Sequence, residues 1–443
     1  MILSVLLQTP PAWVVIPFVS LLLLIATGPV LFPKFWHHYY KTISVVLGLL
    51  VGVFYLVQLH NMVLPIEAIA EYLSFISLLT VLYIASGGIY LFFDMESKAS
   101  VNIVFLFVAA AIANLIGTTG ASVLFIRPFM RINRYRLQPY HIVFFIFMVS
   151  NVGGSLTPIG DPPLFMGFLK GVPFFWTLIN LWLPWLVAML MLLGVFYFFE
   201  TRNKQLDDVD VSTHYSNRVI ISGKRNLIWL LIGVASVFLD PNIMDGLPHI
   251  SFHGKKISFV REIIQLSAAF LCFKFSNQKA LKSNNFDFEP IKEVAFLFFG
   301  IFLTMMPALQ LLEAFAGAQK GQIAITDSLV YWASGIFSSV LDNAPSYLNV
   351  FAVILSDAGL SLNNMADVKQ FMTSERVHLL LSLSIGSVFF GAMTYIGNGP
   401  NFMVKSIAEQ VGVKMPSFGK YIFKYSLPIL MPVLVLIWFI FFI

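Results

Sequence analysis

The sequence predicts an all-α polytopic membrane protein built as an inverted-topology repeat. Of its 443 residues, 58% are hydrophobic and only 11% are charged, whereas soluble domains carry about 25% charged residues. Apolar runs of about 20 residues, the length of a membrane-spanning helix, recur along the whole chain. Two similar segments rich in glycine and proline interrupt these runs, one in each half of the sequence.

The composition also excludes several classes of protein. The net charge of +5 does not indicate a nucleic-acid partner, because the basic residues lie in short segments between apolar runs. The single cysteine, Cys272, excludes a disulfide framework. The first apolar run, from Ala12, has no basic segment before it and exceeds the apolar region of a signal peptide, so we expect a permanent first helix.

The apolar runs predict helical segments whose boundaries are soft by several residues. These segments are 12–30, 42–60, 72–93, 101–116, 123–130, 141–152, 177–199, 226–239, 258–275, 290–314, 328–340, 345–355, 377–390 and 421–443. The longest polar interruptions are 200–225 and 275–292, and the first of them lies near the middle of the chain. We therefore predict a first repeat over 1–205, a cytoplasmic connector over 206–225 and a second repeat over 226–443.

The two halves show the same order of segments. Each has three full spans, then a shorter interrupted pair, then a span broken at a glycine-proline segment, then one more span. The interrupted pairs are 101–130, broken at "GTTGAS", and 328–355, broken at "LDNAPS", and both predict re-entrant hairpins. Each half then crosses the membrane five times, which gives about ten crossings in total. Because five is odd, the second half enters the membrane in the opposite orientation to the first. Many secondary transporters have this plan.

Two checks support this reading. Aligning 154–166 with 391–403 gives identity at seven of the thirteen positions. With the N-terminus outside and the central loop 200–225 in the cytoplasm, 20 of the 27 basic residues lie on the cytoplasmic side. If either hairpin instead crossed the bilayer as a full pair, the sidedness would not change, so charge leaves that alternative open.

The broken spans, 141–169 and 377–409, predict a polar site inside the membrane. Their first arms are about 18 and 21 Å long, so both breaks fall beyond the middle of a hydrocarbon core about 30 Å thick. Unwound backbone at that depth must be buried in protein or line a polar cavity. The following half-helix presents its positive end to the break, and the unwound carbonyls offer the opposite polarity. The alternative is a simple bend, which is common in membrane helices.

The hairpin tips supply further oxygen atoms. Their candidate residues are Thr118, Thr119, Ser122, Asp342, Asn343 and Ser346. Hydroxyl, amide and carboxylate oxygens suit hard cations such as Na⁺, although the same side chains also cap short helices.

Asp161 and Asp342 carry the strongest functional signal. Each lies in a polar break with no basic residue in its motif, and an intramembrane carboxylate is a functional candidate by default. A proton and a sodium ion would compete for such oxygens; the alternative is a structural aspartate bonded to backbone amides. We expect His141 at a membrane boundary without a role and Glu313 in an interfacial position.

Three motifs, "SNVGGSLTPIGDPP" (150–163), "LDNAP" (341–345) and "GNGPN" (397–401), resemble the ion transporter superfamily, closest to its sodium/proton antiporters and citrate-transporter-like members. The resemblance spans both halves. It implies a homodimer with a scaffold part and a transport part that moves like an elevator. It also implies cation and substrate sites among the broken helices and hairpin tips. The candidate binding residues are Asn151, Ser155, Thr157, Asp161, Asp342, Asn343, Thr394, Asn398 and Asn401, with Na⁺ expected at Asp161, Asp342, Asn151 and Asn398.

One departure bears on the substrate. The dicarboxylate symporters of this superfamily carry paired Ser-Asn-Thr triplets, whereas here Val152 follows Ser150 and Asn151. We therefore expect an integral protein of the bacterial inner membrane that exchanges Na⁺ and H⁺ and uses no other cofactor. A sodium- or proton-coupled carrier of citrate or a related carboxylate is the alternative, and an ion channel is a third. The sequence has no His-Glu-x-x-His and no Gly-x-Ser-x-Gly motif, so we expect no enzyme.

Overall fold

The computed structural model describes residues 9–203, 218–241, 244, 246–252, 255–319 and 324–443. Within this part of the chain, nine helical segments are long and apolar enough to cross a membrane. The prediction of an all-α polytopic membrane protein is confirmed. The segments are Ala12–Pro29, Pro33–Val57, Val63–Gly87, Ala99–Ile132, Pro139–Leu156, Phe174–Thr201, Glu289–Ala318, Glu375–Met393 and Phe418–Phe442.

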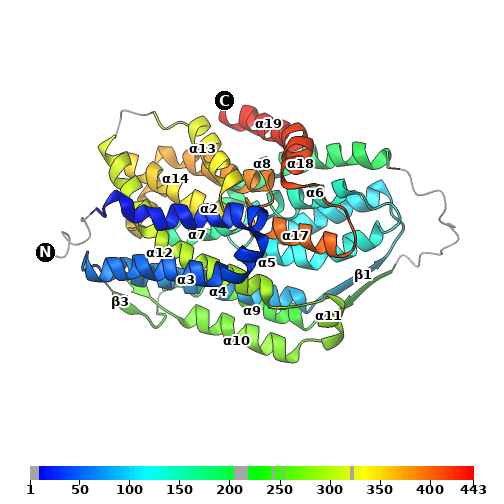
Figure 1. The fold of residues 1–443 in the computed structure, drawn as a ribbon, viewed down its shortest axis with the longest axis horizontal. Helices are drawn as coiled ribbons and strands as arrows, with labels where there is room; N and C mark the ends of the chain where they lie inside the picture. The colour runs from blue at the N-terminus through cyan, green and yellow to red at the C-terminus, as the bar shows by residue number, and fades with distance from the viewer. Residues whose placement is uncertain (1–8, 204–217, 242–243, 245, 253–254, 320–323) are drawn as a thin grey trace.

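One group of helices packs along one flank of the molecule, and we call it the framework (Figure 1). It takes helices from the start of each half of the chain, with α3 packed on α12 and α4 packed on α10. Its members are α2 (Ile16–Leu31), α3 (Pro33–Val57), α4 (Val63–Gly87), α9 (Asn226–Ser236), α10 (Val260–Phe275) and α12 (Glu289–Ala318). A short helix, α11 (Gln278–Ser283), lies between α10 and α12 in the chain.

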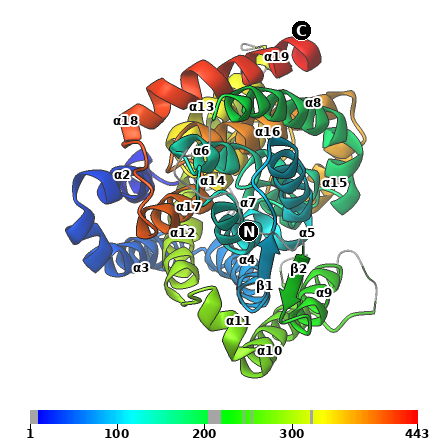
Figure 2. The same ribbon diagram turned by 90° about the vertical axis from the view of Figure 1, so that its right-hand side faces the viewer.

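The remaining helices form a second group, the core bundle, again from both halves (Figure 2). Its members are α5 (Ala99–Ile132), α6 (Pro139–Met148), α7 (Pro162–Lys170), α8 (Phe174–Thr201), α13 (Asp327–Val340), α14 (Asn343–Asp357), α15 (Met365–Met372), α16 (His378–Phe390), α17 (Gly399–Gln410), α18 (Phe418–Tyr421) and α19 (Met431–Phe442). A π-helical stretch, Ile422–Leu430, joins α18 to α19 around Pro428, which lacks a backbone N–H. The two groups touch mainly where α12 meets α14 and α4 meets α5.

Helix α5 is a hairpin rather than a straight rod. Gly117 has φ of 76°, a left-handed conformation that glycine adopts without steric cost, and the chain reverses there. Phe105 and Phe129 stack with ring centroids 5.4 Å apart, although a straight helix would separate them by about 36 Å. The Asn102 amide likewise donates to Asn133 Oδ1 at 2.7 Å. The two arms therefore lie against each other.

Helices α13 and α14 form the second hairpin around Leu341 and Asp342. Their distant ends meet the start of α16, where His378 lies 2.8 Å from Asp327 and Arg376 lies 2.6 Å from Asp357. The two arms therefore run antiparallel from a shared tip. Both hairpins end on the polar motifs that the sequence singles out, and their re-entry into the membrane stays a prediction.

Some boundaries differ from the predicted ones. The segment predicted over 72–93 is α4, which begins at Val63, because Glu67 and Glu71 lower the hydropathy of a stretch that is nevertheless helical and largely buried. Tyr90–Asp94 is strand β1, paired antiparallel with β2 (Arg218–Ser222). A second ribbon joins β3 (Ile250–Phe252) to β4 (Lys255–Ile257). Residues 206–217 of the predicted connector, and the two residues before them, lie outside the described residues.

Candidate functional site

Both predicted breaks separate two helices of the core bundle with non-helical backbone. In the first, α6 ends at Met148 and α7 begins at Pro162; in the second, α16 ends at Phe390 and α17 begins at Gly399. Each break contains a short 3₁₀ segment, Val152–Leu156 or Gly391–Met393. Asp161 and Asn398 hold the same place, the last extended residue before α7 or α17.

Paired glycines explain how each break folds so tightly. A Cβ atom on Gly160 would lie 2.0 Å from the Gly154 carbonyl oxygen, and one on Gly397 would lie 2.6 Å from that of Gly391. Real Cβ atoms do not approach backbone this closely, so only glycine permits the chain to pass itself here. The two pairs occupy matching positions in the two halves.

Asn114, on the first arm of the α5 hairpin, fastens that hairpin to the first break. Its amide donates to the Gly153 carbonyl at 2.6 Å, and its Oδ1 accepts from the Leu156 N–H at 2.8 Å. The Thr157 hydroxyl donates to the Asn114 carbonyl at 2.5 Å, and the Thr118 N–H donates to the Gly160 carbonyl at 2.7 Å. The sequence analysis missed Asn114; its signal is an amide in an apolar run, three residues before the tip.

The second hairpin is fastened to the second break in a matching way. The Thr394 hydroxyl donates to the Ser339 carbonyl at 2.7 Å, as Thr157 does to Asn114. Thr394 Oγ1 also accepts from the Gly397 N–H at 3.1 Å, the same distance at which Thr157 Oγ1 accepts from Gly160. These matched contacts support the predicted repeat, because residues at corresponding positions make corresponding bonds.

The two breaks meet at the centre of the core bundle. The Asn398 amide donates to Asp161 Oδ1 at 3.0 Å and to Asn151 Oδ1 at 3.2 Å. The Asn151 amide in turn donates to Asn401 Oδ1 at 2.7 Å. All four side chains are buried. All four are candidate binding residues predicted from the sequence, and the structure brings them together across the two halves.

Asp161 is held by neutral groups alone. Thr118 Oγ1 donates to its Oδ1 at 2.8 Å, and the Asn343 amide donates to its Oδ2 at 2.7 Å, in addition to Asn398. Its carboxylate is 1% exposed and forms no ion pair with any residue that the structure describes. A buried charge costs free energy unless it is compensated, so this carboxylate requires a cation or a proton.

An oxygen next to Asp161 has no partner. Asn343 uses its amide for Asp161, while its Oδ1 is buried and accepts no hydrogen bond from the described residues. An unsatisfied buried carbonyl costs about 1–3 kcal/mol, and a bound cation is one way to satisfy it. This oxygen is therefore a natural ligand for a hard cation beside the Asp161 carboxylate.

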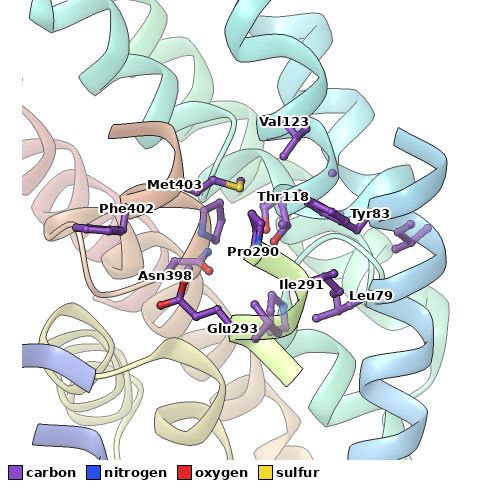
Figure 3. Close-up of a pocket in the computed structure, with 18 of the residues that line it drawn as sticks. Leu79, Tyr83, Thr118, Val123, Pro290, Ile291, Glu293, Asn398, Phe402 and Met403 are labelled. Atoms are coloured by element: carbon purple, nitrogen blue, oxygen red, sulfur yellow. The ribbon is translucent and has the colours of Figure 1, made fainter. Parts of the chain in front are cut away.

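A cavity of about 550 Å³ lies between the framework and the core bundle and reaches Asp161 (Figure 3). Asp342, Asn398, Thr118 and Thr119 also line it. Asp342 keeps its Oδ1 as the cap of α14, accepting from the Ala344 N–H at 3.1 Å. The cavity contains both aspartates predicted from the sequence.

The charge of the cavity is predominantly negative. Besides Asp161 and Asp342, its lining includes the carboxylates of Asp287, Glu289 and Glu293, against the guanidinium of Arg127 and the imidazole of His37. Low-dielectric walls around a cleft of one sign concentrate counter-ions, so this cavity attracts cations.

Other predicted site residues build the breaks rather than line the cavity. Each is bonded within the protein: Ser155 to the Val152 carbonyl, Ser122 to Ser150, Ser346 to the Asp342 carbonyl, and Thr157, Thr394, Asn151 and Asn401 as described above. Asn401 is the most constrained, because its amide donates to the carbonyls of both Gly391 and Thr394. These side chains position the ligands rather than face the cavity.

His141 is fully buried within the protein near the start of α6, and its expected position at a membrane boundary stays a prediction. Its Nε2 lies 3.1 Å from Glu200 Oε2, and Tyr140 and Asn102 also donate to that carboxylate. Arg136 forms an ion pair with Glu200 as well. The glutamate on α8 needs these partners because it is 1% exposed.

The described residues contain no group of three or more histidine, cysteine, aspartate or glutamate side chains placed to hold a metal. A transition-metal centre of that kind is therefore absent from this part of the chain. The oxygen atoms around Asp161 suit a hard monovalent cation instead.

A family model described as "Putative citrate transport" matches residues 7–442, which is nearly the whole chain. No curated protein matches this sequence.

Proposed function

The chain belongs to this putative citrate transport family, and we propose that it is a secondary active transporter that exchanges Na⁺ and H⁺ at Asp161. The observation that carries the proposal is a buried carboxylate with three neutral hydrogen-bond donors and no basic partner among the described residues. It lines an acidic cavity. The negative charge of such a carboxylate is removed by a proton or compensated by a bound cation.

The chemistry follows from competition for the same oxygens. Thr118, Asn343 and Asn398 hold the carboxylate in one orientation by donating to it. A sodium ion would take a carboxylate oxygen together with Asn343 Oδ1, the unsatisfied acceptor beside it. A proton on Asp161 removes the charge that attracts sodium. Binding of one ion therefore excludes the other, which couples their movements.

Alternating access would use the division between framework and core bundle. Asp161 and its donors all belong to the core bundle, whereas α3, α4 and α12 of the framework supply much of the facing cavity wall. A sliding movement of one group past the other would carry the ions across the membrane, in the elevator manner that the superfamily resemblance implies. The homodimer, the bacterial inner membrane and the N-terminus-outside orientation stay predictions.

Sodium-coupled citrate transport is the second candidate, favoured by the family description and by Arg127. The Arg127 guanidinium lines the cavity and makes no hydrogen bond or ion pair with the described residues. The sequence analysis counted it only as a topology signal. A guanidinium binds carboxylates in a bidentate manner, so Arg127 would receive one carboxylate of citrate. The acidic lining opposes this trianion unless sodium binds first.

A flux panel distinguishes these candidates. The protein is reconstituted into liposomes with an internal pH dye and challenged with gradients of Na⁺, Li⁺, K⁺ or citrate. Exchange predicts a proton flux driven by Na⁺ or Li⁺ without citrate, lost in Asp161→Asn and kept in Arg127→Gln. Citrate symport predicts saturable citrate uptake that requires sodium and is lost in Arg127→Gln. A channel would conduct ions far faster than a carrier turns over.

A matched control separates site chemistry from surface charge. Glu409→Gln removes a carboxylate of α17 that is exposed and paired with Lys405 at 2.9 Å. We expect this variant to transport like the wild type. Absence of any response to Na⁺, Li⁺ or H⁺ in the wild-type protein would contradict the proposed exchange.

A further inference from the structure

Glu293 is an unpaired carboxylate on the wall of the cavity. It lies in the first turns of α12, is partly buried and lines the same space as Asp161 and Asn398. Among the described residues it forms no hydrogen bond and no ion pair. None of the chemistry proposed at Asp161 uses it.

No basic group forms an ion pair with Glu293 among the described residues, although His37 and Lys41 lie close enough to stabilise its charge. Glu289, one turn earlier on the same helix, takes Lys292 at 2.9 Å and Lys41 at 3.8 Å. His37 of α3 also lines the cavity, without an ion pair to Glu293. Both lysines therefore pair with the exposed Glu289, and Glu293 lines the cavity without an ion-pair partner among the described residues.

The position of Glu293 relates it to the site. It projects from the framework into the cavity, while Asn398 and Thr118 project into the same space from the core bundle (Figure 3). Residues 284–287, which precede α12, line the cavity as well. Glu289 at the start of α12 is exposed, Glu293 one turn later is partly buried, and Asp161 is buried. A cation that enters beside the start of α12 would therefore meet Glu293 before Asp161.

We propose that Glu293 is a peripheral cation site that captures Na⁺ and passes it to Asp161. This inference rests on the proposed exchange at Asp161 and adds a second, weaker site on its route. A single carboxylate with water completing its coordination holds a monovalent cation loosely, which permits onward transfer. Its effect is to raise the cation concentration in the cavity, so it governs how much external sodium is needed.

The position of Glu293 on the framework has a consequence for transport. If the core bundle carries Asp161 past the framework, Glu293 stays behind. It then acts only on the face of the membrane to which the cavity opens, which is the cytoplasmic face in the predicted orientation. Capture at Glu293 therefore affects sodium uptake from that face. It does not alter how Asp161 holds the ion once it is bound.

The test measures sodium affinity separately from maximal rate. Everted vesicles present the predicted cytoplasmic face to the medium, and sodium titrations give the half-maximal concentration and the maximal rate. We expect Glu293→Gln to raise the half-maximal sodium concentration about three- to ten-fold, with a maximal rate close to that of the wild type. Glu293→Asp retains the carboxylate and should restore most of the affinity.

Glu409→Gln is the matched control, because it removes a carboxylate that already has a lysine partner and does not line the cavity. Its sodium affinity should equal that of the wild type. In the wild-type protein, choline chloride at about 1 M shortens the screening length to about 3 Å and should reproduce the loss of affinity without any substitution.

The outcomes are distinct. An unchanged half-maximal concentration in Glu293→Gln, or an equal shift in Glu409→Gln, would overturn the peripheral site. Loss of maximal rate with unchanged affinity would also overturn it, since Glu293 would then belong to the transport step itself. A wild-type protein without sodium-dependent proton flux would instead contradict the proposed exchange at Asp161. The wild-type measurement therefore separates failure of the exchange from failure of the peripheral site at Glu293.

Discussion

The Asn398 amide donates to Asp161 Oδ1 at 3.0 Å, and these two residues occupy the same position in the two halves of the chain. Each is the last extended residue before the second helix of its break. The bond therefore joins the halves at their most similar point. One partner is charged and the other is neutral, so the matched positions produce a single carboxylate at the centre rather than two that repel each other.

Removing the Asn398 side chain should weaken both the fold and the site. Asn398→Ala deprives the buried Asp161 and Asn151 oxygens of a donor, at a cost of about 1–3 kcal/mol. Thermal unfolding in detergent should show a lower midpoint, and sodium titration a lower affinity. Asn180→Ala on α8 is the control, because that exposed amide bonds only within its own helix and should change neither.

Gly160→Ala should prevent the first break from closing. The added Cβ would lie 2.0 Å from the Gly154 carbonyl, so the backbone must move and the Asp161 carboxylate moves with it. We expect transport to be lost and the unfolding midpoint to fall. Gly194→Ala in α8 is the comparison, since its Cβ would meet nothing within 4 Å. That change should be neutral or slightly stabilising, because alanine favours helix by about 1 kcal/mol.

Lys170 links the end of α7 to the framework. Its ammonium lies 2.7 Å from Glu71 Oε1, and the two side chains are 8% and 21% exposed. Lys170→Met leaves a carboxylate without its partner and should cost about 2–4 kcal/mol, less than a fully buried pair because Glu71 is partly solvated.

The double variant Lys170→Met, Glu71→Gln should recover part of that loss, because no uncompensated charge remains. Lys405→Met, which breaks an i,i+4 pair on the surface of α17, should change the unfolding midpoint very little. Equal losses in the Lys170 and Lys405 variants would contradict the structural role given to the buried pair.

Asp342 offers a way to separate charge from capping. Asp342→Asn keeps an oxygen that can accept from the Ala344 N–H, so α14 should stay capped and the midpoint unchanged. The cavity loses one negative charge, and the sodium concentration for half-maximal transport should rise. Asp342→Ala removes the cap as well and should lower the unfolding midpoint by an amount that matches about 1 kcal/mol. If Asp342→Asn lowered the unfolding midpoint as much as Asp342→Ala, the effects of charge and capping would not be separable in this way, and the prediction would be wrong.

Much of the site follows from the sequence because its signals are local. The glycine-proline breaks, the tip at Gly117 and the two aspartates stand out against apolar runs, and the structure places them together. The periodicity of the sequence could not predict which residues of distant segments contact each other. Nothing near Asn114 indicates that its amide holds Gly153, and nothing near Glu293 indicates that it faces Asn398 rather than solvent. Such contacts depend on how distant helices pack.

Two other differences have the same origin. Glu67 and Glu71 displaced the predicted boundary of α4 because hydropathy does not register that Lys170, about a hundred positions along the chain, compensates Glu71. The partners of His141 could not be predicted either, because Glu200, which encloses it together with Tyr140, lies far along the chain. Polar residues in apolar segments are predicted poorly wherever their partners are remote.

The central claim is that sodium and a proton compete for Asp161, and proton release on sodium binding tests it most directly. Purified protein in weakly buffered detergent solution is mixed with NaCl, and the released protons are followed with a pH dye, using choline chloride as the salt control. The wild type should release protons in a saturable manner with sodium, and Asp161→Asn should release none. Equal release from both proteins, or none from the wild type at any starting pH, would contradict the account.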